Sequence, residues 1–257
     1  MSLENKVKNE YGNIAGIVVL KNDSVVYESY FNQCSENEPI HVFSVTKSII
    51  SMLFGIAIDK GYIKNLDEKV IDFFPNYKIK KREKTIQHIT IKNLLTMTAP
   101  YKYKSNPYTK FFSSADWVTS SLDLLGGSGK IGDFRYAPVI GIDILSGILI
   151  NTTGQSVLEF AQDNLFSPLK ISVEKNVYFR NKEEQFDFYK SKGINGWVAD
   201  PNGTNTAGWG LSLTTMDMAK LGLLYLNKGL LYNRQIVSEK WVSESTQVQS
   251  IWETRNL

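Results

Sequence analysis

The sequence predicts an α+β fold in which helices pack on a small β-sheet. Two observations lead to this class: β-branched segments with strand character lie near the N-terminus, and apolar segments of helical length follow them along most of the chain. The 257 residues are 42% hydrophobic and 21% charged, close to the averages of globular domains. A chain of this length suits one large domain, with room for an inserted lobe.

The strands are expected at the beginning of the chain. Residues 14–20 form a β-branched apolar run, the polar residues 21–24 are typical of a turn, and residues 25–31 resume the strand character. This pattern predicts a β-hairpin, which a polar loop over residues 32–39 follows.

Helices are expected over most of the remaining chain. The first begins at Ser44 and ends at Gly61, and apolar residues surround so much of its circumference that it belongs in the core. Residues 98–135 are aromatic, rich in glycine and irregular, which is typical of a lid or a small helical lobe. Further helices are expected over residues 90–97, 140–151, 156–165, 214–227 and 233–245, whereas residues 176–198 are polar and weakly patterned.

Composition excludes several classes of function. The net charge of +3 at pH 7 is small and the lysines are scattered, so no nucleic-acid partner is expected. The most apolar segment, residues 140–150, contains Asp143 and is too short to span a bilayer. The single cysteine, Cys34, excludes an internal disulfide, and without a Cys/His cluster we expect no metal and no cofactor. A Ser-His-Asp triad would have to use His41 or His88, the two histidines of the chain.

The N-terminal residues Met-Ser-Leu-Glu-Asn-Lys lead into no apolar signal-peptide core. The chain as given is therefore expected in the cytoplasm, and it is expected outside the cell if a signal peptide was removed. The sequence leaves the compartment and the oligomeric state open.

A candidate nucleophile lies at the start of the buried helix. Ser44-Val45-Thr46-Lys47 has the form S-x-x-K, and residues three apart share a helix face, so Lys47 can approach the Ser44 hydroxyl. Serine at its ordinary pKa needs an adjacent base, and a lysine in an apolar pocket can become one because its charge loses hydration. The helix N-terminus adds positive potential, and the Ser44 N–H can point into an oxyanion hole.

The motif alone leaves two interpretations open. Ser167–Lys170 and Ser172–Lys175 have the same form, but the first begins at a helix end before a proline and the second lies in a polar stretch. Only Ser44 starts a buried helix. On the local pattern, an ordinary N-cap with Lys47 reaching into solvent is as good an interpretation as a catalytic pair.

Four longer segments carry a family resemblance. They are HVFSVTKSIISMLFGIAIDKGYIKNLDEKVIDFFP, ITIKNLLTMTAP, TGQSVLEFAQDNLFSPLKI and TAGWGLSLTTMDMAKLGLLYLNKG, followed by IVSEKW. In this order they resemble the serine β-lactamase and penicillin-binding protein family, in the branch of class C enzymes, esterases and aminohexanoate-oligomer hydrolases. The resemblance covers about residues 14–245. It implies a β-lactamase/transpeptidase-like fold, with an antiparallel sheet flanked by helices, and assigns Ser44 as nucleophile and Lys47 as base.

The resemblance also implies a domain organisation. Residues 1–257 are expected to form one β-lactamase-like domain, into which a helical or irregular lobe of about residues 75–205 is inserted. The family's third motif, K-T-G or H-x-G, does not occur after Trp209, so the chain is expected to stop before the family's C-terminal strands. A sheet of only the N-terminal hairpin would be marginal.

In this family a tyrosine of the helical lobe faces the serine, usually as Y-x-N, and the resemblance assigns this role to Tyr136. A phenol near two cations can relay a proton to the leaving group; the alternative is a loop tyrosine packed on Phe134. Pro138 stands in place of the asparagine, so a side-chain acceptor for the lysine and the substrate is missing. Gly208 and Trp209, in the Gly-rich turn, are candidate substrate-binding residues.

The leading functional hypothesis is a serine hydrolase that forms an acyl-enzyme with a small ester, amide or peptide-like substrate. The missing asparagine favours esters and small amides over β-lactams. The alternative is a binding or sensor module of the same fold, which acylates without turnover or does not react.

Overall fold

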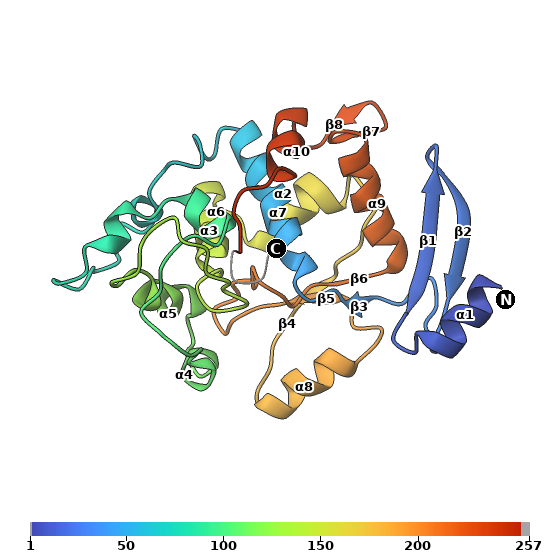
Figure 1. The fold of residues 1–257 in the computed structure, drawn as a ribbon, viewed down its shortest axis with the longest axis horizontal. Coiled ribbons are helices and arrows are strands. Elements are labelled where there is room, and N and C mark those ends of the chain that lie inside the picture. Colours follow the sequence, from blue (N-terminus) through green and yellow to red (C-terminus); the bar gives the residue numbers. More distant parts are fainter. Residues whose placement is uncertain (1, 253–257) are drawn as a thin grey trace.

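A computed structural model describes residues 2–252, and it begins with a helix and a hairpin (Figure 1). Helix α1 (Leu3–Glu10) precedes β1 (Gly16–Lys21) and β2 (Ser24–Tyr30), which pair antiparallel. Asn22 and Asp23 join the strands with φ angles of 49° and 61°, a left-handed turn that suits the twist of a hairpin. The predicted hairpin is therefore confirmed, whereas α1 was not predicted.

The remaining strands are short, and each pairs with one partner. They are β3 (Ile40–His41) with β6 (Ser212–Leu213), β4 (Lys175–Val177) with β5 (Gly196–Val198), and β7 (Leu230–Leu231) with β8 (Arg234–Gln235). Residues 2–252 thus hold four two-stranded sheets, and β4–β5 is parallel while the other pairs are antiparallel. The antiparallel sheet that the resemblance implied is divided into separate pairs in this part of the chain.

Most helices lie where the apolar patterning predicted them. They are α2 (Val45–Asp59), α3 (Ile91–Leu95), α6 (Ile144–Thr153), α7 (Val157–Ala161), which continues as the π-helix η3 (Gln162–Phe166), and α9 (Thr215–Leu226). The helix predicted over residues 233–245 is wrong in its first half. Tyr232 and Asn233 have φ angles of 47° and 60° and turn the chain back into β8, so that α10 (Glu239–Ser245) begins only after Ser238 caps it.

Helices outside the regular apolar segments were harder to predict. Helices α4 (Tyr108–Phe112) and α5 (Trp117–Leu124) lie in the segment expected to be a lid or lobe, and α8 (Lys182–Lys190) lies in the weakly patterned segment. Asn181 caps α8 by accepting a hydrogen bond from the Glu184 N–H at 2.9 Å. The 3₁₀-helices η1 (Val70–Phe73) and η2 (Thr85–His88) complete the described helices.

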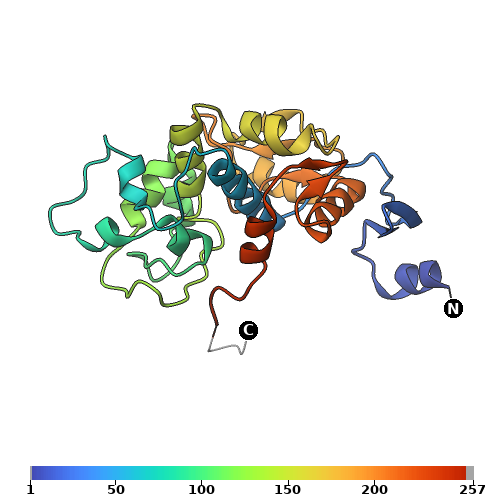
Figure 2. The same ribbon diagram turned by 90° about the horizontal axis from the view of Figure 1, so that it is seen from above.

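Helix α2 lies between the two ends of the molecule. Figures 1 and 2 both show the hairpin and α1 at one end, the segment with α4 and α5 at the other, and α2 between them. In the described residues, none of the helices combines the length and apolar composition that a membrane crossing requires. The insertion of a lobe at about residues 75–205 stays a prediction.

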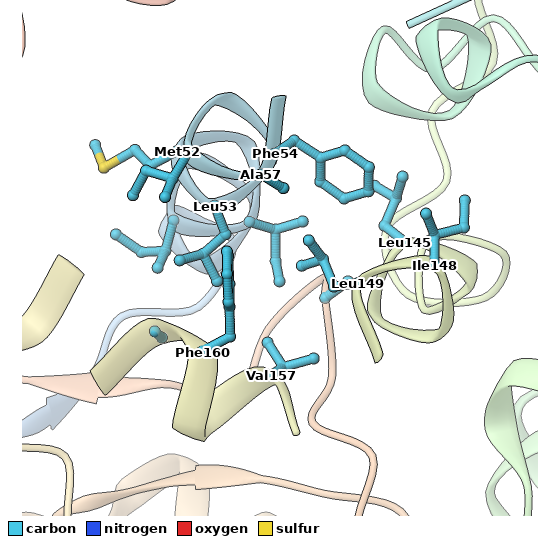
Figure 3. Close-up of a cluster of buried hydrophobic side chains, with 14 of the residues drawn as sticks. Met52, Leu53, Phe54, Ala57, Leu145, Ile148, Leu149, Val157 and Phe160 are labelled. Atoms are coloured by element: carbon cyan, nitrogen blue, oxygen red, sulfur yellow. The ribbon is translucent and has the colours of Figure 1, made fainter. Parts of the chain in front are cut away.

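The core around α2 fixes the position of its N-terminus. Leu53, Phe54 and Ala57 are fully buried, and Figure 3 shows them facing apolar side chains of α6 and α7. Burying one large apolar side chain contributes about 1.5–3 kcal/mol, so several such contacts hold α2 firmly. Close approach matters too: a Cβ at Gly55 would lie 2.4 Å from the Trp241 ring of α10. The residues before α2 are therefore presented from a rigid support.

Candidate active site

Ser44 lies immediately before α2, and its side chain is available for chemistry. It occupies the N-cap position but makes no capping hydrogen bond, and it is exposed. The hydroxyl of Thr46 donates instead to the Phe43 carbonyl at 2.7 Å. Phe43 has a φ of 47°, a left-handed conformation that costs a non-glycine residue on the order of 1 kcal/mol or more and is concentrated at functional sites. The geometry does not fit the interpretation of Ser44 as an ordinary cap.

Lys47 points at Ser44 and is tied to two distant segments. Its Nζ donates to Ser44 Oγ at 3.0 Å, to the Pro138 carbonyl at 2.9 Å and to the Gly208 carbonyl at 2.6 Å. The side chain is partly buried, so the alternative of a lysine reaching into solvent is also not supported. The three acceptors match the three N–H groups of an ammonium.

This arrangement also suits the neutral amine. A neutral amine has two N–H groups and one lone pair. The two carbonyls can accept hydrogen bonds but cannot donate them. The carbonyls of Pro138 and Gly208 would therefore keep the two N–H groups, and the lone pair would face the Ser44 hydroxyl. Loss of one proton converts Lys47 from a donor to Ser44 into an acceptor from it, with little movement.

The electrostatics of the site bring the pKa of Lys47 close to neutrality. Burial lowers the pKa of Lys47 to about 8, and the negative charge of Asp143 partly opposes this effect. Asp143 is fully buried before α6 and accepts the Ala207 N–H at 2.7 Å. Burial raises the pKa of Asp143 to about 7, although the N–H groups of Ala207 and Gly208 and the charge of Lys47 act in the opposite direction. A buried carboxylate and the candidate base therefore influence each other.

The acceptor missing from the side chain of Pro138 is supplied by its backbone. Proline offers no side-chain acceptor, as expected, but its carbonyl accepts from Lys47, because a carbonyl is present whatever the residue type. Gly208 plays the matching part on the other side of Lys47. A Cβ at Gly208 would lie 2.9 Å from the Pro138 oxygen and 3.5 Å from Lys47 Nζ, so a side chain would crowd the base.

Tyr136 lies beside the candidate base. Its ring centroid is 6.0 Å from Lys47 Nζ, and 46% of the residue is exposed. The ring stacks on Trp252 at 6.2 Å, and Phe134 contacts the same tryptophan at 5.4 Å. The structure therefore places the Tyr136 ring beside Lys47, and that its hydroxyl faces Ser44 stays a prediction.

Trp209 lies behind the site instead of lining it. It is only 5% exposed, and its ring packs against Tyr189 at 5.6 Å and against His41 at 6.0 Å. His41 Nε2 accepts the Gly210 N–H at 3.0 Å, and burial lowers the pKa of His41 to about 4. Trp209 thus supports the site from the protein interior, whereas the Gly208 carbonyl contacts Lys47 directly.

Neither histidine makes a triad with the nucleophile. Between residues 2 and 252, no hydrogen bond joins His41 or His88 to Ser44, and the same residues contain no group of His, Cys, Asp and Glu side chains that could hold a metal ion.

Sequence reasoning missed three residues that contribute to the site: Phe43, Asp143 and Tyr189. For Asp143 the sequence holds a signal, because it is the single charge in the apolar run of residues 140–150.

Fold and site together define the class of serine β-lactamases and transpeptidases. The family model of the beta-lactamases matches residues 6–255, and the chain therefore belongs to the beta-lactamase family. Two relatives are similar in sequence. An uncharacterized protein of Alkalihalophilus pseudofirmus is 26% identical over 92% of this chain and 65% of its own length. The 6-aminohexanoate-dimer hydrolase of Paenarthrobacter ureafaciens is 22% identical over 88% of this chain and 55% of its own length.

Solved structures show the same fold. A Bacillus anthracis protein proposed to be a 6-aminohexanoate-dimer hydrolase superposes with a TM-score of 0.71 at 19% identity, over 95% of this chain and 61% of its own. The octameric penicillin-binding protein homologue of Pyrococcus abyssi superposes with a TM-score of 0.62 at 22% identity, over 89% and 55%. The chain spans 55–65% of the length of these relatives. The fold class inferred from the sequence is confirmed.

Proposed function

We propose that this protein is a serine hydrolase that forms an acyl-enzyme on Ser44, with Lys47 as general base. The observation that carries this proposal is the 3.0 Å contact of Lys47 Nζ with Ser44 Oγ, while two carbonyls hold the other N–H groups. As the Ser44 oxygen attacks the substrate carbonyl, its proton passes to the neutral amine of Lys47. Collapse of the tetrahedral intermediate expels the leaving group, and water then hydrolyses the ester on Ser44.

Tyr136 has the place of a proton relay in this scheme. Its ring lies beside Lys47, so its hydroxyl can carry the proton from the amine to the departing alkoxide or amine. Helix α2 begins directly after Ser44, and its N-terminal N–H groups favour the negative charge that develops on the attacked carbonyl oxygen.

Esters and small amides are the proposed substrates. The side chain of Pro138 offers no amide to bind an acyl amide, which favours them over β-lactams. One relative is named as a 6-aminohexanoate-dimer hydrolase. Its name supports a beta-lactamase family that includes hydrolases of substrates other than β-lactams. The family match over residues 6–255 includes Ser44, Lys47 and Tyr136.

Covalent labelling tests the nucleophile. The protein is treated with a fluorophosphonate probe, digested and analysed by mass spectrometry. The adduct is expected on the peptide that contains Ser44, and Ser44→Ala is expected to remain unlabelled. An adduct on the peptide of Ser167 or Ser172, or equal labelling of Ser44→Ala, would refute the assignment.

A second candidate function is an acylating sensor that does not turn over. Pro138 in place of the family's asparagine favours it. Burst kinetics with a chromogenic ester separate the two. Continuous release after the burst supports the hydrolase, a burst equal to the enzyme concentration without further release supports the sensor, and no release at all contradicts both.

A further inference from the structure

Four aromatic side chains belong to a cluster that lies beside the Ser44–Lys47 pair. They come from separate segments: Phe43 precedes α2, Tyr108 begins α4, Tyr136 precedes α6, and Tyr189 lies near the end of α8. Phe43 is 54% exposed and Tyr108 is 39% exposed, while Tyr189 is partly buried. We call these four residues the aromatic rim.

Contacts place Phe43, Tyr136 and Tyr189 beside the Ser44–Lys47 pair, and Tyr108 joins them through Phe112 and Trp209. Phe43 is the neighbour of Ser44 in sequence, and its ring stacks on that of Tyr189 at 6.0 Å. Tyr136 lies over Lys47. Burial raises the pKa of Tyr108, and the nearby Tyr136 raises it further. Burial likewise raises the pKa of Tyr189, which the hydrogen bond with Gln185 opposes and the nearby Tyr108 reinforces.

A buried layer holds the rim in place. Tyr108 stacks on Phe112 at 6.1 Å, and Phe112 meets Trp209 edge to face at 6.0 Å. Trp209 also packs against Tyr189 at 5.6 Å. Aromatic pairs at these separations add about 0.5–1.5 kcal/mol beyond the burial of their area. The exposed rings therefore rest on fixed partners, and their arrangement is preorganised for a ligand.

We propose that the aromatic rim binds the apolar part of the substrate's acyl group. The inference rests on the proposed function and adds a substrate class to it: neutral esters or amides with an alkyl or aryl acyl group of several carbons. None of the four rim side chains is a carboxylate, an ammonium or a guanidinium. The ammonium at the site, that of Lys47, already has three acceptors, so a charged acyl group would find no free partner among these residues.

A series of p-nitrophenyl esters tests this inference, because the leaving group stays constant while the acyl group changes. Acetate, butyrate and hexanoate are compared by the second-order rate constant of acylation, each divided by the rate of hydroxide hydrolysis. Full transfer of one methylene from water is worth about fourfold, so a partly open rim should favour hexanoate over acetate by about tenfold or more.

Variants locate the effect. Tyr189→Ala and Tyr108→Ala are each expected to reduce the hexanoate-to-acetate ratio about threefold or more, whereas Tyr189→Phe keeps the ring and should keep the ratio. The matched control is Tyr232→Ala, because Tyr232 is 80% exposed in the turn between β7 and β8. The two rim tyrosines lie on different helices, so one variant still reports if the other folds poorly, which circular dichroism detects.

The outcomes distinguish this inference from the proposed function. If no ester acylates Ser44, the proposed function fails and the rim loses its role with it. If the esters acylate Ser44 but the ratio is near one, or if Tyr232→Ala changes it as much as the rim variants, only the rim is refuted. Faster acylation by the succinate half-ester or by the 4-aminobutyrate ester than by butyrate would also overturn it, because the subsite would then prefer charge.

Discussion

Raising the pH from 6 to 10 should increase the acylation rate of Ser44 in proportion to the neutral fraction of Lys47. Burial lowers the pKa of Lys47 to about 8, and only the neutral amine can accept the Ser44 proton. About one tenth of the amine is neutral at pH 7 and about nine tenths at pH 9, so the rate should rise about tenfold between these two pH values and level off above pH 9. A lysine with an ordinary pKa near 10.4 would instead give a rate that still climbs at pH 10.

The assay is the pre-steady-state release of p-nitrophenol from p-nitrophenyl acetate at constant ionic strength, followed at a wavelength where absorbance does not depend on pH. Lys47→Arg is the matched variant, because it keeps a cation of similar reach whose pKa lies above 12. It should lose about 10² to 10⁴ in acylation rate, the usual contribution of a general base, and should show no midpoint near pH 8.

Lys47→Ala should lose acylation to a similar degree but should also be less stable. The carbonyls of Pro138 and Gly208 lose their donor, which costs on the order of 1–3 kcal/mol for a buried acceptor left unpaired. Rates are therefore compared where circular dichroism shows both variants folded. A flat profile, a midpoint near that of free lysine, or wild-type acylation by Lys47→Arg would refute Lys47 as the base.

Two further predictions concern the surroundings of the site and the core. Asp143→Asn should move the midpoint of the acylation profile below that of the wild type, because the carboxylate, mostly ionised at pH 8, raises the pKa of Lys47; the same titration measures it, and an unchanged or higher midpoint would show that the two groups are not coupled. Gly55→Ala should destabilise the protein in denaturant unfolding by about 1–3 kcal/mol, since the new methyl group would overlap the Trp241 ring. Gly222→Ala is its control on α9, where nothing lies within 4 Å and better helix propensity should add up to about 1 kcal/mol; equal effects at the two glycines would contradict the packing argument.

Local patterns predicted the parts of the fold that depend on neighbouring residues. The hairpin and α2 follow from β-branched runs, turn residues and an apolar circumference, all of which act within a few residues. The positions of Ser44 and Lys47 on one face of α2 follow from helix geometry in the same way. Helix α8 escaped prediction because its nine residues carry one buried apolar side chain, Phe188, and its order depends on its cap.

The partners of Lys47 could not be predicted, because they are backbone atoms far away in the sequence. The Pro138 carbonyl comes from 91 residues downstream and the Gly208 carbonyl from 161. A carbonyl leaves no mark in the sequence, since every residue has one. The rim was missed for a related reason: Tyr108 and Tyr189 lie in irregular or polar segments, and only the tertiary fold brings them to Ser44.

The backbone acceptors of Lys47 change the meaning of a substitution in the Y-x-N motif. A side-chain amide at position 138 could be lost by mutation, whereas the carbonyl of Pro138 remains as long as the chain follows the same path. That path depends on supports outside the motif. Asp143 anchors the Ala207 N–H, and Gly208 has no side chain to push its neighbours away from Lys47. Loss of the asparagine therefore leaves the backbone hydrogen bonds of Lys47 in place, and changes at Asp143 or Gly208 should disturb these bonds more.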